Sequence, residues 1–143
     1  MLIGQYQHTI DIKKRLALPS KFRGELGEKV IITKGLEGCL VVYTEKEWEI
    51  SAGKLANLPA SQVEARAFAR FQLASATEVT LDKLGRILLP DYLKEFAEFK
   101  KNVTICGLST RVEIWDSEKW GAYSKNAEKG VEDIVSKLGP FGI

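Results

Sequence analysis

The sequence has few of the residues from which enzymes and metalloproteins build their reactive centres. It contains only two cysteines, Cys39 and Cys106, and one histidine, His8. Two cysteines at non-matching places exclude a disulfide framework and a four-ligand metal site, so we expect reduced, half-buried thiols. His8 has no cysteine or carboxylate at the spacing of metal ligands, and neither a nucleophile elbow nor a glycine-rich phosphate loop is present. We therefore expect no metal, no cofactor and no enzymatic activity.

Long apolar runs and an apparent targeting segment are also missing. No stretch approaches the ~18 apolar residues of a membrane-crossing helix. Residues 1–15 reach His8, Asp11 and three basic side chains too early for a secretory signal. A chain of 143 residues, 45% of them hydrophobic, can bury about two-thirds of its unfolded surface. We expect a cytoplasmic protein with one core and no membrane partner.

One motif is present twice. Its four residues recur 71 residues later at the same spacing: Asp11, Arg15, Leu18 and Pro19 match Asp82, Arg86, Leu89 and Pro90. Three further pairs match at a spacing of 72 residues: Gly35 and Gly107, Tyr43 and Trp115, Trp48 and Trp120. Internal repetition of this kind indicates architecture. We predict two half-size units of common ancestry, related by a pseudo-twofold axis.

Each unit is predicted to contain four strands. Alternating apolar residues and turn residues indicate a strand, a turn and a return strand around each motif, at 5–10, 11–14 and 15–18 and at 78–81, 82–85 and 86–89. Pro19 and Pro90 each lead into a short helical segment, the second over 92–96. Apolar hairpins follow, from 30–32 to 40–43 and from 103–105 to 112–115.

Capping signals place the longer helices. Thr44 begins a capping box, and Asp116 is the matching cap in the second unit. Trp48 and Trp120 each follow their cap by four residues and are expected to anchor the core.

A linking helix is predicted between the units. Ser61-x-x-Glu64 is a capping box that opens a helix through Ala74. Arg66 and Arg70 share one face of this helix. We favour a packing role for that face, with an oligomer seam or a DNA-binding stripe as the alternatives.

Together these elements predict an α+β fold, a duplicated swapped-hairpin β-barrel with connecting helices. Nothing between residues 50 and 78 has the composition of a flexible linker. We therefore predict one compact domain over 1–143, made of a first repeat at 5–48, linking helices at 49–76, a second repeat at 77–120, and a C-terminal helix and tail at 121–143.

Basic charge is concentrated in the first unit. The net charge is only +2, but residues 1–35 carry seven Lys and Arg against three Asp and Glu. The candidate DNA-binding residues are the basic side chains around the two motifs: Lys13, Lys14, Arg15, Lys21, Arg23, Lys83 and Arg86.

The motif itself has a physical interpretation. An aspartate that closes a turn accepts backbone N–H groups and orients the facing arginine, so Asp11, Asp82 and Gly85 are the predicted turn-structuring residues. A fixed guanidinium suits phosphate or guanine. The alternative is a purely structural ion pair, which carries more weight for the second unit than for the first. Arginine would lower the pKa of each aspartate, which disfavours a general acid.

Several local patterns resemble those of the MraZ family, bacterial transcriptional regulators built from two SpoVT-AbrB-type, or AbrB/MazE-like, swapped-hairpin units. The patterns cover residues 1 to 125: Gly4-x-Tyr6-x-His8-x-Ile10-Asp11-x-Lys13-x-Arg15, Leu18-Pro19-x-x-Phe22-Arg23, Ala65-Arg66-x-Phe68-x-Arg70-Phe71, and Asp82-x-x-Gly85-Arg86-Ile87-x-Leu89-Pro90. Each alone is weak, and together they are specific.

The resemblance implies a function. The expected partner is double-stranded promoter DNA with short repeated elements, commonly that of the protein's own division and cell-wall gene cluster. It would be bound by a ring-shaped homo-oligomer of about eight subunits. The expected location is cytoplasmic and nucleoid-associated. A non-enzymatic, antitoxin-like protein-interaction module of the same superfamily is the alternative.

The resemblance also implies DNA contacts from particular residues. They are Arg15 with its neighbours Lys13 and Lys14, and Arg86 as the equivalent in the second unit. Lys14 stands where the family often has glycine, so we expect the first turn to follow a slightly different path.

Overall fold

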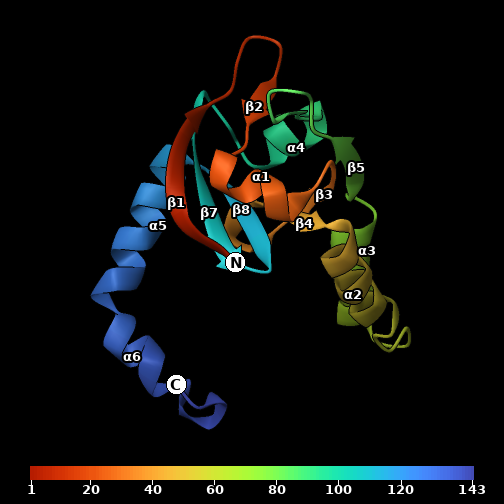
Figure 1. The fold of residues 1–143 in the computed structure, drawn as a ribbon. Helices are drawn as coiled ribbons and strands as arrows, with labels where there is room; N and C mark the ends of the chain where they lie inside the picture. Colours follow the sequence, from red (N-terminus) through yellow and green to blue (C-terminus); the bar gives the residue numbers. More distant parts are fainter.

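The computed structural model describes residues 1–143 and has a mixed α+β fold (Figure 1). The first half of the chain contains β1 (Leu2–Thr9), β2 (Arg15–Ala17), α1 (Ser20–Leu26), β3 (Lys29–Lys34), the 3-10 turn η1 (Leu36–Gly38), β4 (Leu40–Thr44) and α2 (Glu45–Ala56). The linking helix α3 (Val63–Leu73) follows. The second half contains β5 (Thr77–Thr80), β6 (Arg86–Leu88), α4 (Asp91–Phe96), β7 (Asn102–Ser109), β8 (Arg111–Asp116) and α5 (Ser117–Lys129), and the chain ends with α6 (Val131–Ser136) and the 3-10 turn η2 (Gly139–Phe141). The mixed α+β class predicted from the sequence is confirmed.

The strands of the two halves are interleaved. Six strands form one antiparallel sheet in the order β1-β7-β8-β4-β3-β5, and β2 pairs with β6 in a separate two-stranded ribbon. β1 from the first half pairs with β7 from the second, and β5 from the second pairs with β3 from the first. Exchanging each first-half strand with its counterpart leaves this order unchanged. Neither half therefore owns a complete sheet.

The strand register has the same symmetry. Val41 lies opposite Glu113 where β4 meets β8. In the outer strands, Thr9 pairs with Asn102 and Thr80 pairs with Lys29. Lys29 therefore corresponds to Asn102, one residue further along than the 72-residue spacing of the matched glycines indicates. The hairpins account for the difference, because η1 lies between β3 and β4 whereas a single residue separates β7 from β8.

The main core lies between one face of the large sheet and a cover made of the β2–β6 ribbon, α1 and α4 (Figure 1). It is a cluster of 19 buried residues drawn from both halves. Leu16 and Ile87, which pair at the centre of the ribbon, are both fully buried in it. Burial of these apolar side chains fixes the ribbon, and with it the turns at its ends, against the sheet.

A smaller cluster packs on the opposite face of the sheet. It contains Cys39, Val41, Cys106 and Trp115, with Trp120 of α5 against it. The cysteines are fully buried rather than half-buried as predicted, because the sheet and α5 cover both thiols. That burial raises the pKa of Cys39 and of Cys106 to about 12.

Two of the three predicted helix starts are confirmed. The Thr44 side chain accepts a hydrogen bond from the Glu47 N–H at 3.1 Å, and the Asp116 side chain accepts one from the Lys119 N–H at 3.4 Å. The predicted cap at Ser61 is wrong. α3 begins at Val63, and its N-terminus has no side-chain cap.

The tryptophans predicted to anchor the core are also corrected. Trp48 and Trp120 are only partly buried, whereas Trp115 in β8 is 3% exposed. Trp48 packs on Tyr43, and Trp120 donates a hydrogen bond to Gln5 at 2.8 Å. Position four of each helix faces the rim of the sheet, so these rings shield the edges of the core rather than fill it.

The linking helix α3 is fixed to the sheet by buried hydrogen bonds. Thr33 of β3 donates its hydroxyl to the Gln72 carbonyl at 2.6 Å and lies 2.9 Å from the Ser75 hydroxyl. The Gln72 side chain returns a bond to the Lys34 carbonyl at 3.0 Å. The predicted linker helix is therefore packed against the first half.

The C-terminal helices leave the body of the molecule. α5 starts against the sheet, and α6 continues away from it, on the opposite side from α2 and α3 (Figure 1). Every residue of α6 is exposed. No helix in the structure has the length and apolar character needed to cross a membrane.

Candidate nucleic-acid interface

A single aspartate organises the turn between β1 and β2. One carboxylate oxygen of Asp11 accepts the backbone N–H groups of Lys13 and Arg15, each at 2.9 Å. The other oxygen accepts Arg15 Nε at 2.8 Å. Backbone bonds between Asp11 and Arg15 and between Lys14 and Asp11, both 3.0 Å, close the turn. The Arg15 guanidinium is therefore held in one orientation, as the sequence motif predicts.

The turn between β5 and β6 repeats this arrangement. Asp82 accepts the N–H groups of Leu84 and Arg86 at 2.9 and 2.8 Å, and its second oxygen accepts Arg86 Nε at 2.7 Å. Backbone bonds of 2.9 Å again close the turn. We call these two units the Asp11–Arg15 and Asp82–Arg86 clamps.

Each clamp lowers the acidity constant of its aspartate in the same way. The backbone N–H of Arg15 is the largest cause that holds the pKa of Asp11 below its ordinary value of 3.8, and the Arg15 side chain adds to the effect. For Asp82 the backbone N–H of Arg86 is the largest cause of the lowered pKa. Both carboxylates remain charged at neutral pH and act as fixed acceptors.

The two turns follow the same backbone path, which corrects one prediction. Lys14 was expected to divert the first turn because it replaces a glycine. Its φ is 64°, and φ of the equivalent Gly85 is 73°. The hydrogen bonds of the clamp hold Lys14 in the left-handed conformation, which costs a non-glycine residue about 1–2 kcal/mol.

The ribbon places the two clamp arginines on one surface. Leu16 and Ile87 point into the core, so the residues on either side of them face outward. Arg15 and Arg86 are on this outer face, with side chains 32% and 28% exposed. Arg86 pairs with Ala17, which leaves the two guanidiniums offset by two positions across the ribbon.

Each turn is also tied to the other half of the chain. The Leu89 N–H donates to the Lys14 carbonyl at 2.9 Å, and the Leu18 N–H donates to the Gly85 carbonyl at 3.0 Å. Lys14 Nζ forms an ion pair with Asp91 at the start of α4, at 2.5 Å. The orientation of each turn therefore depends on both halves.

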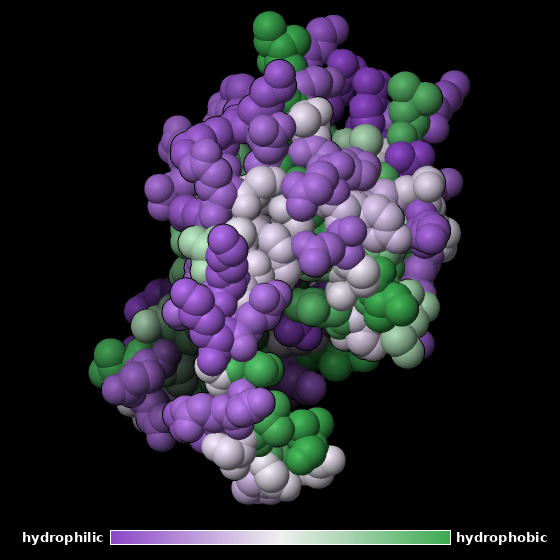
Figure 2. Space-filling view, turned by 90° about the vertical axis from the view of Figure 1, so that its left-hand side faces the viewer, coloured by the Kyte–Doolittle hydropathy of each residue, from purple (hydrophilic) through white to green (hydrophobic).

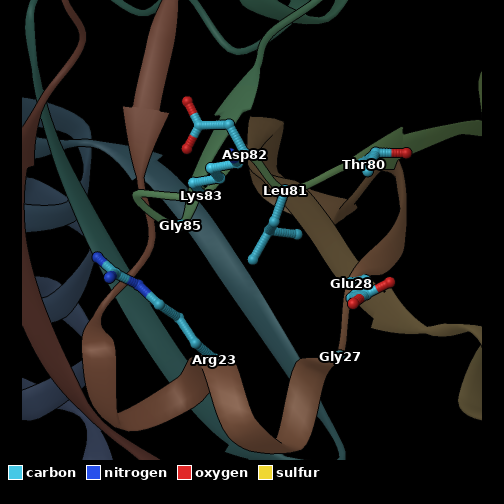
Figure 3. Close-up of a pocket in the computed structure, with 8 residues that line it drawn as sticks. All are labelled: Arg23, Gly27, Glu28, Thr80, Leu81, Asp82, Lys83 and Gly85. Atoms are coloured by element: carbon cyan, nitrogen blue, oxygen red, sulfur yellow. The ribbon is translucent and has the colours of Figure 1, made fainter.

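Arg23 braces the second turn from the first half. Its Nε donates to the Leu18 carbonyl at 2.9 Å. The side chain reaches from α1 toward the Asp82–Arg86 clamp and fills the space beside Gly85 (Figure 3). With Lys83 and Glu28 it lines an open pocket of about 530 Å³ between α1 and the β5–β6 turn.

The remaining predicted residues fall into two groups. Lys13 is exposed at the tip of the first turn, and Lys83 is exposed at the tip of the second. Lys21 is exposed on α1 but lies beside Met1 and Ile3 at the start of β1, away from both turns. The structure thus brings together six of the seven predicted basic residues and separates Lys21 from them.

Sequence reasoning missed the contacts that cross between the halves. Asp91 follows the Leu-Pro step of the second motif, but no local pattern indicates that it pairs with Lys14. It also gave no role to two apolar tip residues, Ile12 and Leu84, which are 99% and 62% exposed. Their place inside the duplicated turns was the available signal.

The surface agrees with a polar ligand. Figure 2 shows hydrophilic residues over much of one side of the molecule, with isolated hydrophobic residues at the end where the turns lie. No group of three or more histidine, cysteine, aspartate and glutamate side chains is placed to hold a metal ion.

Fold and site together define a class of protein: α+β proteins with two interleaved halves that present paired basic turns on one ribbon. The family model described as "MraZ protein, putative antitoxin-like" matches residues 1–71 and 73–138. The chain belongs to the MraZ family.

Curated relatives agree over their whole length. The chain is 52% identical to the protein named Transcriptional regulator MraZ from Caldanaerobacter subterraneus subsp. tengcongensis, over 143 residues and all of both chains. It is 50% identical to the protein of that name from Thermoanaerobacter pseudethanolicus and 49% identical to the one from Acetivibrio thermocellus, again over all of each chain.

Proposed function

We propose that this protein is a sequence-specific, DNA-binding transcriptional regulator of the cytoplasm and nucleoid. The observation that carries the proposal is the pair of Asp–Arg clamps, which hold Arg15 and Arg86 outward on one ribbon. A fixed guanidinium fork matches two acceptors on guanine or a phosphate, and its side-chain entropy is already lost before binding. The names of the full-length relatives support the same function.

The proposed contacts divide by role. Arg15 and Arg86 contact base edges or phosphate, while Lys13 and Lys83, at the turn tips, contact phosphate. Lys14 and Arg23 position the turns through Asp91 and through the Leu18 carbonyl, and they contribute their charge as well. Lys21 adds charge at a distance from the turns.

The wider architecture is also a proposal. The interleaved strand order supports two swapped-hairpin repeats over 5–48 and 77–120, joined by linking helices at 49–76 and followed by a tail at 121–143. We propose that copies assemble into a ring of about eight subunits that binds short repeated elements in the protein's own promoter. Several modest contacts then act together, so avidity replaces individual affinity.

The test measures binding of the full-length protein to the duplex upstream of its own gene by fluorescence anisotropy, against a scrambled duplex and over a series of salt concentrations. We expect tight binding to the native duplex that weakens as salt rises. Arg15→Ala abolishes this preference without changing the oligomer size, and Arg15→Lys, which keeps the charge but loses the fork, is intermediate. Lys125→Ala removes one positive charge from an exposed position of α5 and leaves binding nearly unchanged.

Equal, weak binding to both duplexes would contradict the proposal. It would leave only nonspecific charge attraction and would favour the second candidate, a non-enzymatic protein-interaction module. The antitoxin-like description of the matching family model is the observation behind that candidate.

A further inference from the structure

The tips of the two turns each carry one exposed apolar side chain. Ile12 is 99% exposed and Leu84 is 62% exposed. A single exposed apolar residue needs no explanation. Here two of them lie at the outer ends of two identical clamps, each next to a lysine, Lys13 or Lys83. The duplication of this pairing indicates a shared ligand with both an apolar and an anionic group.

The backbone beneath these side chains is fixed. In the first turn, Lys13 and Arg15 donate to Asp11 on either side of the tip. The carbonyl of Lys14 accepts the Leu89 N–H from the other half. Ile12 is β-branched and therefore has few side-chain rotamers. It can enter a contact with little further loss of conformational entropy.

We propose that Ile12, and Leu84 at the second tip, contact the C5-methyl groups of thymine in the major groove. This inference rests on the proposed function. The major groove admits a two-stranded β-ribbon, and the thymine methyl is the apolar group that its base edges present. In this arrangement Arg15 and Arg86 bind guanine or phosphate from the ribbon, while the tip residues discriminate thymine from the other pyrimidine.

The order of residues differs between the two tips. Ile12 occupies the place of Lys83, and Lys13 occupies the place of Leu84, at the 71-residue spacing of the motif. The apolar and basic side chains therefore exchange positions from one turn to the other. The two turns of one chain read different base orders, although their clamps have the same geometry.

The experiment compares the native upstream duplex with the same duplex in which uracil replaces thymine, since uracil lacks only the C5-methyl. Full-length wild-type protein is expected to bind the thymine duplex about fourfold more tightly for each methyl it contacts. Ile12→Ala binds the two duplexes with a ratio reduced by about that factor, and Ile12→Val retains most of the wild-type ratio.

The matched control is Leu36→Ala. Leu36 is 60% exposed, but it lies in η1 and lines a pocket with Phe68 and Arg111 rather than either turn. Its replacement leaves both the affinity and the thymine-to-uracil ratio at the wild-type values.

Each contrary result has its own meaning. An unchanged ratio in Ile12→Ala overturns the methyl contact while leaving the DNA-binding function in place. Weaker binding of Ile12→Ala to both duplexes by the same factor also overturns it, in favour of a wedge between base pairs. If wild-type protein does not prefer the native duplex to a scrambled one, the proposed function fails, and this inference fails with it.

Discussion

Lys14 and Gly85 occupy equivalent places and meet the same backbone requirement differently. Both have a positive φ, which glycine adopts freely and lysine does not. Lys14 is retained there by the clamp and by its ion pair with Asp91. Gly85 has no side chain, and the space beside it is filled by Arg23 from the other half. Each solution links its turn to the opposite repeat.

Replacement of Gly85 by alanine is expected to destabilise the protein on two grounds. The left-handed φ costs about 1–2 kcal/mol in the free energy of unfolding. In addition, a Cβ at Gly85 would lie 2.1 Å from Arg23 Nε, so the arginine must move. Urea denaturation measures the loss, and the same substitution in an Arg23→Ala background is expected to show only the φ contribution.

Gly24 provides the matched control for this substitution. It lies inside α1 with no atom within 4 Å of an added Cβ, so Gly24→Ala is expected to stabilise the helix by about 0.5–1 kcal/mol. If Gly85→Ala and Gly24→Ala had the same effect on the free energy of unfolding, the strained turn and its brace would both be refuted.

At the scale of elements, the two clamped turns behave as small cooperative units. Each contains one aspartate that accepts three hydrogen bonds and thereby fixes five consecutive residues. Hydrogen bonds to the charged form of a carboxylate lower its pKa, so the stability of the turns is linked to pH.

The direction of that linkage follows from the lowered values. Asp11 and Asp82 titrate below 3.8 in the folded protein, and near 3.8 when unfolded. Their stabilising contribution is therefore complete above pH 3.8 and is lost as the pH falls through the folded pKa. In urea denaturation at a series of pH values, Asp11→Asn combined with Asp82→Asn is expected to flatten the acid limb of the stability curve.

A double variant at unclamped positions controls for the loss of two charges. Asp133 and Glu132 lie on the exposed helix α6, outside both turns. Asp133→Asn with Glu132→Gln is expected to keep the wild-type acid limb. An acid limb in the clamp variant as steep as that of the wild type would disprove the linkage.

The sequence predicted these elements to the extent that their bonds are local. The clamps span five residues and the Thr44 cap spans four, so motif and spacing were sufficient to find them. The cap at Ser61 failed because an identical local pattern lost to the packing of α3, which begins at Val63. The bond from Leu18 to Gly85 and the ion pair of Lys14 with Asp91 join residues far apart in the sequence, and no local rule detects them.

The whole molecule is held together by exchange between its halves. β1 and β5 each pair only with a strand of the opposite half, and the ribbon takes one strand from each. The 19-residue core likewise draws on both. The orientation of the clamp arginines is thus a property of the complete chain, because the ribbon that displays them exists only when both halves are present.

Residues 1–76 expressed alone are therefore expected not to form a stable monomer. β1 would lack β7, β2 would lack β6, and the outward faces of the core cluster would meet water. A dimer is possible because the central pairs are nearly self-complementary: Leu16 opposite Ile87 becomes Leu16 opposite Leu16, and Val41 opposite Glu113 becomes Val41 opposite Val41. Circular dichroism with light scattering over a range of concentrations is expected to show folding coupled to dimer formation, and addition of residues 77–143 to restore the full-length fold. A cooperatively folded monomer of residues 1–76 at the lowest concentration would refute the exchange as the source of stability.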